Sequence, residues 1–74
     1  MVRLPNVSGR QAREAFERAG FEFQRQTGSH IILSKPGFRE NLSVPNHRRV
    51  RPGLLRNLIK KAGLTVEEFN DLLR

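Results

Sequence analysis

Two histidines and a group of arginines and lysines are the residues of this 74-residue chain whose types could do chemistry. Histidine has an unperturbed pKa that lets it both take and give a proton near neutral pH. Beside an RNA phosphodiester, His30 could deprotonate the 2′-hydroxyl, which is RNA's own nucleophile, or protonate the leaving 5′-oxygen. Nearby cations would hold the scissile phosphate. His30 is therefore the best candidate for a residue that cuts RNA; the ordinary alternative is a surface histidine in a strand.

Three other polar residues are auxiliary candidates. His47 lies in a Pro45-Asn46-His47 loop, where a capping or hydrogen-bonding role is the ordinary explanation and contact with a phosphate is the alternative. Gln24 and Ser29 are expected as neighbours of His30, because one lies in the preceding strand and the other comes directly before it.

Basic residues supply candidate contacts to a phosphate backbone. Three arginines run straight into a helix that Pro52 opens, so the free N–H groups and dipole of that helix add to their charge. The alternative to phosphate binding by this group is an ordinary solvated helix face. For Lys35, beside the hairpin, the alternative is a charge that protects a sheet edge from aggregation. The candidates for RNA binding are Lys35, Arg48, Arg49, Arg51, Arg56 and Lys60.

Composition narrows the class of partner. The formal net charge is +7, and no acid occurs between Glu40 and Glu67, so the excess forms a patch that favours nucleic acid or an acidic protein. With no cysteine and only two histidines, neither a metal nor a cofactor is expected. The first residues lack the apolar run that a signal peptide needs, so none is expected, and the chain has no run of about 18 apolar residues that could span a bilayer. We expect one cytoplasmic domain over residues 1–74 with no membrane contact.

Helical periodicity predicts an opening helix that positions the first strand. Ser8 and Gln11 form a capping-box pattern, an apolar stripe follows at helical spacing, and Gly20 suits the position after the helix. From Phe21 the period changes to two, which predicts an antiparallel hairpin. The expected register pairs Phe23 with Ile31, Phe21 with Leu33 and Gln24 with His30.

That register predicts a three-residue loop, Gln26 to Gly28, with Gly28 in the left-handed conformation. It also places His30 on the sheet face away from the helices.

The rest of the chain predicts a third strand and two more helices. Leu42 to Val44 forms a short strand that ends at Pro45; a helix begins at Pro52 and stops at Gly63. A last short helix starts at Thr65, whose capping-box partner is Glu68.

The order α-β-β-β-α(-α) predicts a two-layer α+β fold with a three-stranded antiparallel sheet. A double-stranded-RNA-binding-domain-like arrangement has this order, and a ferredoxin-like or other small α+β fold is the alternative.

Several short motifs in combination point to a family. They are Ser8-Gly9, Ala19-Gly20-Phe21, Gly28-Ser29-His30, Val44-Pro45-Asn46-His47, Pro52-Gly53-Leu54-Leu55 and Ala62-Gly63-Leu64. With these motifs the chain resembles, over nearly its whole length, the HicA toxins of bacterial and archaeal toxin–antitoxin pairs, the YcfA-like mRNA interferases.

The resemblance implies a double-stranded-RNA-binding-like fold and a ribonuclease that cleaves mRNA and arrests translation. In that family the histidine of the Gly-Ser-His motif is catalytic, which here is His30. It further implies a cognate HicB antitoxin that binds the toxin and masks that histidine. The expected function is a metal-independent endoribonuclease toxin. The rival interpretations are a non-catalytic RNA-binding module of the same fold and an adaptor for an acidic protein.

Overall fold

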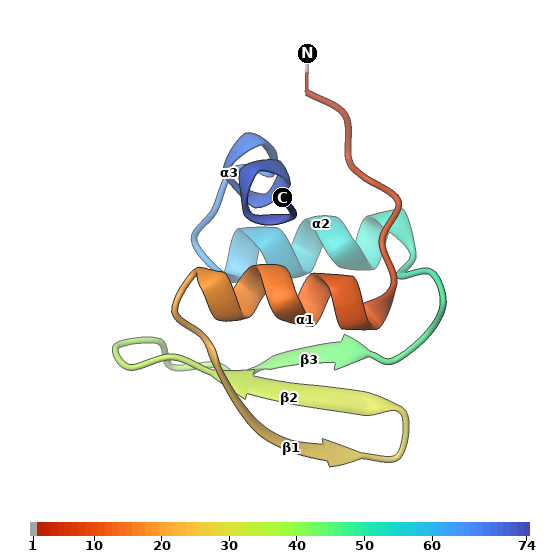
Figure 1. Ribbon diagram of the computed structural model, residues 1–74. Helices are drawn as coiled ribbons and strands as arrows, with labels where there is room; N and C mark the ends of the chain where they lie inside the picture. The colour runs from red at the N-terminus through yellow and green to blue at the C-terminus, as the bar shows by residue number, and fades with distance from the viewer. Residues whose placement is uncertain (1) are drawn as a thin grey trace.

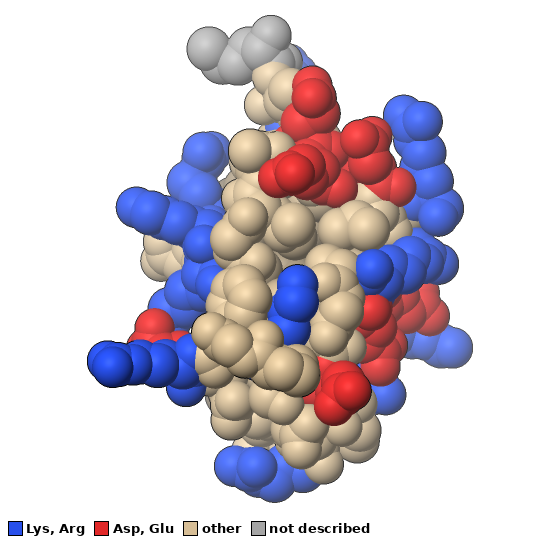
Figure 2. Space-filling model, turned by 90° about the vertical axis from the view of Figure 1, so that its left-hand side faces the viewer, with Lys and Arg blue, Asp and Glu red and all other residues tan. Residues whose placement is uncertain are grey.

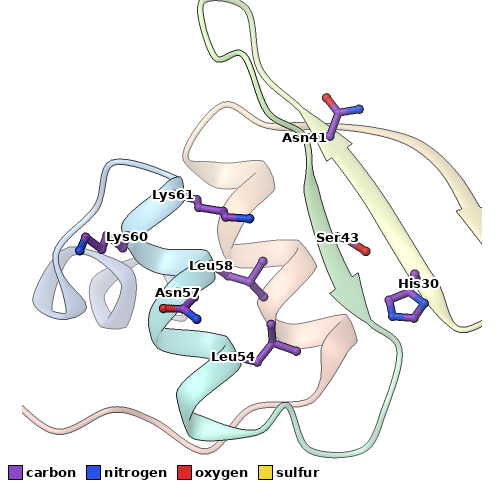
Figure 3. Close-up of a pocket in the computed structure, with 8 residues that line it drawn as sticks. All are labelled: His30, Asn41, Ser43, Leu54, Asn57, Leu58, Lys60 and Lys61. Carbon is purple, nitrogen blue, oxygen red and sulfur yellow. The ribbon is translucent and has the colours of Figure 1, made fainter.

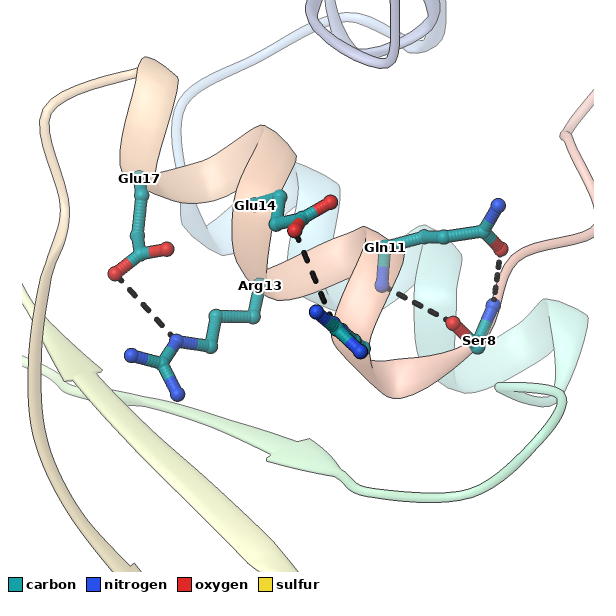
Figure 4. A network of polar contacts seen from close by, with 6 residues as sticks. Ser8, Gln11, Arg13, Glu14 and Glu17 are labelled. Atoms are coloured by element: carbon teal, nitrogen blue, oxygen red, sulfur yellow. Dashed lines mark hydrogen bonds and ion pairs between the residues drawn. The ribbon is translucent and has the colours of Figure 1, made fainter.

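Helix α1 (Gly9–Arg18) begins and ends where the sequence predicts, in a computed structural model that describes residues 2–74. The Ser8 side chain accepts a hydrogen bond from the Gln11 N–H at 3.1 Å, and the Gln11 side chain accepts one from the Ser8 N–H at 2.8 Å (Figure 4). These two bonds satisfy N–H groups that have no partner within the helix. Figure 4 also shows the two ion pairs on the outer face of α1, Arg10 with Glu14 and Arg13 with Glu17.

Strands β1 (Glu22–Thr27) and β2 (His30–Ser34) form the predicted antiparallel hairpin, but in a different register. Phe23 faces Leu33 and His30 faces Thr27. All three predicted pairs are therefore wrong: Phe23–Ile31, Phe21–Leu33 and Gln24–His30. The loop is the two-residue turn Gly28-Ser29 rather than a three-residue loop. Gly28 does have a positive φ of 58°, as expected, because glycine is the residue that adopts this conformation without strain.

A β-bulge between Phe23 and Arg25 explains the difference. With a two-residue turn and unbroken pairing, the polar Gln24 would face Leu33 on the core side of the sheet. The bulge leaves Gln24 out of the pairing, so that Phe23 takes that place. The Gln24 amide instead donates a hydrogen bond to the Ser34 hydroxyl at 2.7 Å.

Strand β3 (Leu42–Pro45) completes a sheet of order β1-β2-β3, and α2 (Pro52–Lys61) and α3 (Val66–Leu72) follow. Pro52 occupies the first turn of α2, and Thr65 and Glu68 form the second capping box, as the sequence predicts. Figure 1 shows the helices stacked over one side of the sheet, with β1 farthest from them.

The core lies between the helices and the inner face of β2 and β3. Alternate residues of these strands are buried, and the buried stripes of α1 and α2 pack against them. The largest fully buried side chains of the core are Phe16, Phe69, Leu33, Leu42, Leu55, Ile59, Val44 and Val50. This confirms the two-layer α+β fold, and the arrangement is compatible with a double-stranded-RNA-binding-like fold. Within residues 2–74, no helix combines the length and the apolar character needed to span a bilayer.

Candidate active site

His30 is the first residue of β2, and its backbone is fixed from two sides. The glycine turn before it sets the direction in which the strand starts. The Asn46 N–H donates a hydrogen bond of 2.6 Å to the Ser29 carbonyl, which ties this turn to the end of β3. Ile31, the next residue of β2, is buried in the core while His30 is exposed. Because neighbouring strand residues point to opposite faces, the His30 side chain leaves the sheet on the face opposite the core.

The His30 side chain lines a groove that the sequence did not predict. This groove has a volume of about 440 Å³ and lies between the β3 side of the sheet and helix α2 (Figure 3). The prediction that His30 lies away from the helices is therefore only partly right. Its side chain leaves the outer face of the sheet, but α2 forms the opposite wall of the groove that it lines. The lining residues are His30, Asn41, Ser43, Leu54, Asn57, Leu58, Lys60 and Lys61.

The groove has an apolar floor and a polar, cationic rim. Leu54 and Leu58 of α2 lie between the two walls in Figure 3, and Ser43 joins His30 on the sheet side. No acidic side chain is among the described residues that line the groove. An anionic group that entered it would meet lysine charge and polar hydrogen-bonding groups, and would not be repelled by a carboxylate.

Of the basic residues singled out from the sequence, the structure brings Lys60 to the His30 groove. Arg48 and Arg49 line a second cavity of about 220 Å³ beside the start of α1. Arg51 is the residue before the first turn of α2 and makes no side-chain capping bond, while Arg56 is exposed on that helix.

Lys35 has a structural environment at the other end of α1. Its ammonium group donates a hydrogen bond of 2.8 Å to the Ala19 carbonyl. The same group lies 5.6 Å from the ring centroid of Phe21 and 5.2 Å from that of Phe38. These contacts hold Lys35 against the C-terminal end of α1.

The auxiliary candidates are likewise placed by backbone contacts. The Ser29 carbonyl is bound to Asn46, and the His47 carbonyl accepts a hydrogen bond of 2.8 Å from the Gly9 N–H. Gln24 lies at the bulge and not opposite His30. None of these three is among the described residues that line the His30 groove.

Sequence reasoning missed the two leucines of the groove and four of its polar residues as site candidates; the polar residues are Asn41, Ser43, Asn57 and Lys61. Asn41 and Ser43 come from the β3 region, and only the tertiary fold brings them near α2. The α2 residues did leave a signal. Leu54, Asn57, Leu58 and Lys61 are spaced i, i+3, i+4 and i+7, so two polar residues share a helix face with two leucines.

A metal ion would need several ligand side chains close together. Among residues 2–74, no three His, Cys, Asp or Glu side chains gather closely enough to hold a metal ion.

Comparison with known proteins identifies the family. The model of the HicA toxin of bacterial toxin–antitoxin systems matches residues 9–64, a stretch that includes the whole sheet, α1, α2 and every groove residue. The chain belongs to the HicA toxin family, so its role is that of a toxin, and this membership implies a cognate antitoxin as partner. No curated protein matched the chain.

Proposed function

We propose that the chain is a metal-independent endoribonuclease that cleaves mRNA in the cytoplasm and thereby arrests translation. The observation that carries this proposal is the position of His30. An exposed histidine on a fixed glycine turn lines a groove that also holds lysine side chains and, among its described lining residues, no acid. Membership of a toxin family also supports this proposal, because a toxin is expected to harm the cell that produces the protein.

The chemistry needs only the substrate's own nucleophile and a group that moves a proton. The 2′-oxygen attacks the adjacent phosphorus, and the bond from phosphorus to the 5′-oxygen breaks. The products are a 2′,3′-cyclic phosphate and a free 5′-hydroxyl. The 2′-hydroxyl loses a proton and the 5′-oxygen gains one. His30 performs one of these transfers and water the other.

The wider basic surface would hold the RNA strand. Arg48, Arg49, Arg51 and Arg56 lie between β3 and the first turns of α2, so a strand that crosses the His30 groove could reach them. Lysine and arginine contacts to phosphates are independent of base sequence and position the strand. A cognate HicB-type antitoxin would inhibit by covering the groove and masking His30.

The test compares three proteins in buffer that contains EDTA. The wild-type chain, His30→Ala and His47→Ala are incubated with a labelled mRNA, and fragments are resolved on a gel. We expect His30→Ala to slow cleavage by about 10²–10⁴-fold, the usual contribution of general acid–base catalysis. His47→Ala is the matched control, since it removes the other histidine, and it should cleave at close to the wild-type rate.

Two results would contradict the proposal. If the wild-type protein leaves mRNA intact and does not slow the growth of bacteria that express it, the chain is no ribonuclease, and RNA binding alone would then favour a non-catalytic module. If His30→Ala cleaves as fast as wild type, the catalyst lies elsewhere.

A further inference from the structure

One face of α2 is turned toward His30 across the groove. Leu54, Asn57, Leu58 and Lys61 recur at the spacing of one helix face, and all four line the groove. Leu58 is only 3% exposed and anchors this face to the core, whereas Leu54 is 40% exposed. A groove lined by apolar side chains together with a few polar groups is typical of a site that binds a ligand.

The two neighbouring lysines of α2 differ in direction. In Figure 3 the Lys61 side chain extends from the helix toward the sheet, on the side where Ser43 and His30 lie. The Lys60 side chain extends away from the sheet. Consecutive helical residues are rotated by about 100° from each other, so the two lysines leave the helix in different directions. Of the two, Lys61 is the one whose side chain extends toward the sheet.

We propose that this face of α2 is a nucleotide subsite that completes the site around His30. The Lys61 ammonium group contacts the phosphate on which His30 acts, and the Asn57 amide hydrogen-bonds to the base of an adjoining nucleotide. This inference rests on the proposed ribonuclease function and names the residues with which that site holds its substrate.

Each residue has the chemistry that its role requires. A lysine ammonium is a compact charge with three donors, and it offsets the negative charge that grows on the phosphate oxygens as the 2′-oxygen attacks. Asparagine carries both a donor and an acceptor, so its amide can pair with the edge of a base. The exposed part of Leu54 offers an apolar surface against which a ribose or base can pack.

The first test compares Lys61 with a basic residue outside the groove. Lys61→Met and Arg10→Met each remove one positive charge from an exposed helix position, but Arg10 lies on the outer face of α1 and does not line the groove. We expect Lys61→Met to reduce the rate of mRNA cleavage by about 10²-fold, as the loss of one donor to a developing oxyanion does. Arg10→Met should stay near the wild-type rate, and Lys61→Arg should recover part of the loss because it restores a cation.

The second test addresses base recognition by Asn57. Asn57→Ala should still cleave, but the bases that flank its cleavage sites, read by sequencing the new 5′ ends, should be less restricted than for wild type. Arg10→Met again serves as the control and should keep the wild-type distribution. An unchanged distribution for Asn57→Ala would remove this residue from the subsite.

A binding measurement separates the subsite from catalysis. With the His30→Ala protein, a short DNA oligonucleotide that lacks 2′-hydroxyls should shift the amide NMR signals of Leu54, Asn57 and Lys61, and Lys61→Met should abolish these shifts. Shifts confined to the Arg48–Arg49 loop would overturn the subsite. Equal cleavage by Lys61→Met and Arg10→Met would also overturn it. In either case, active wild type with inactive His30→Ala would leave the proposed function standing.

Discussion

Gly9 packs against the backbone at the end of β3 more closely than any side chain would allow. A Cβ at this position would lie 2.1 Å from the Pro45 carbonyl oxygen and 2.8 Å from the Asn46 Cα. Asn46 in turn holds the turn before His30 through the Ser29 carbonyl. The glycine that starts α1 thus lies two contacts away from the candidate catalytic histidine, and its missing side chain lets helix and loop meet.

We expect Gly9→Ala to destabilise the fold by about 1–3 kcal/mol, the usual cost of forcing an extra carbon into a packed site. Gly53→Ala is the matched control. Gly53 also lies in the first turn of a helix, but its Cβ would meet nothing within 4 Å, so it should stabilise by up to about 1 kcal/mol. Urea unfolding measures both. Equal effects of the two alanines would show that the close approach at Gly9 costs nothing.

At the scale of the element, the C-terminal end of α1 depends on a lysine from beyond β2. The chain leaves α1 through Gly20, whose φ is 104°, and the Lys35 ammonium reaches back to the Ala19 carbonyl. This bond satisfies a carbonyl that the helix itself leaves open, and a positive charge there complements the helix dipole. The presence of a lysine at position 35 is therefore explained by its role in the fold, without any contact to RNA.

Lys35→Met should lower the free energy of unfolding by about 1 kcal/mol, because Met keeps the aliphatic stem but loses the hydrogen bond. RNA affinity should change no more than for Arg25→Met, which removes one charge from the exposed strand β1. Thermal unfolding and a filter-binding assay distinguish the two effects. A loss of RNA affinity well beyond that of Arg25→Met, without a loss of stability, would return Lys35 to the RNA-binding surface.

Local signals in the sequence predict most of these elements. The capping boxes at Ser8 and Thr65, Pro52 and the glycines after the helices mark ends that the structure confirms. The hairpin register could not be predicted in this way. Alternation of period two identifies which residues share a face, but a bulge changes the partner of every residue beyond it.

The candidate site divides in the same manner. His30 could be singled out because its type and its glycine turn are visible in the sequence. Its partners across the groove could not, because the proximity of α2 to β3 results from tertiary packing of side chains such as Leu55 and Leu58. From the sequence alone, Lys60 and Lys61 are equivalent candidates. Only the structure shows that their side chains extend in different directions.

At the scale of the whole molecule, charge is unevenly distributed. Figure 2 shows a face on which acidic side chains gather near the top, at the height of α3, while basic side chains extend along its flanks and lower edge with further acidic side chains among them. The acidic residues of α3 are Glu67, Glu68 and Asp71. An RNA strand should therefore approach the loop before α2 and its groove, and avoid the α3 end.

Salt titration of RNA binding tests this asymmetry. Each phosphate contact with a single strand contributes about 0.7 to the slope of log affinity against log salt, so replacing Arg48 and Arg49 by Gln should reduce the slope by about 1.4. The control replaces Arg3 and Arg74 by Gln near the α3 end, which removes equal charge and should leave the slope almost unchanged. Equal reductions in both variants would mean that only net charge matters.

The division of the groove between sheet and helix also has a consequence for the order of events during translation. His30 emerges from the ribosome before residues 52–61, which form the opposite wall. A nascent chain that carries the histidine but not yet α2 has no groove, so the candidate site can form only after both of its walls have left the ribosome.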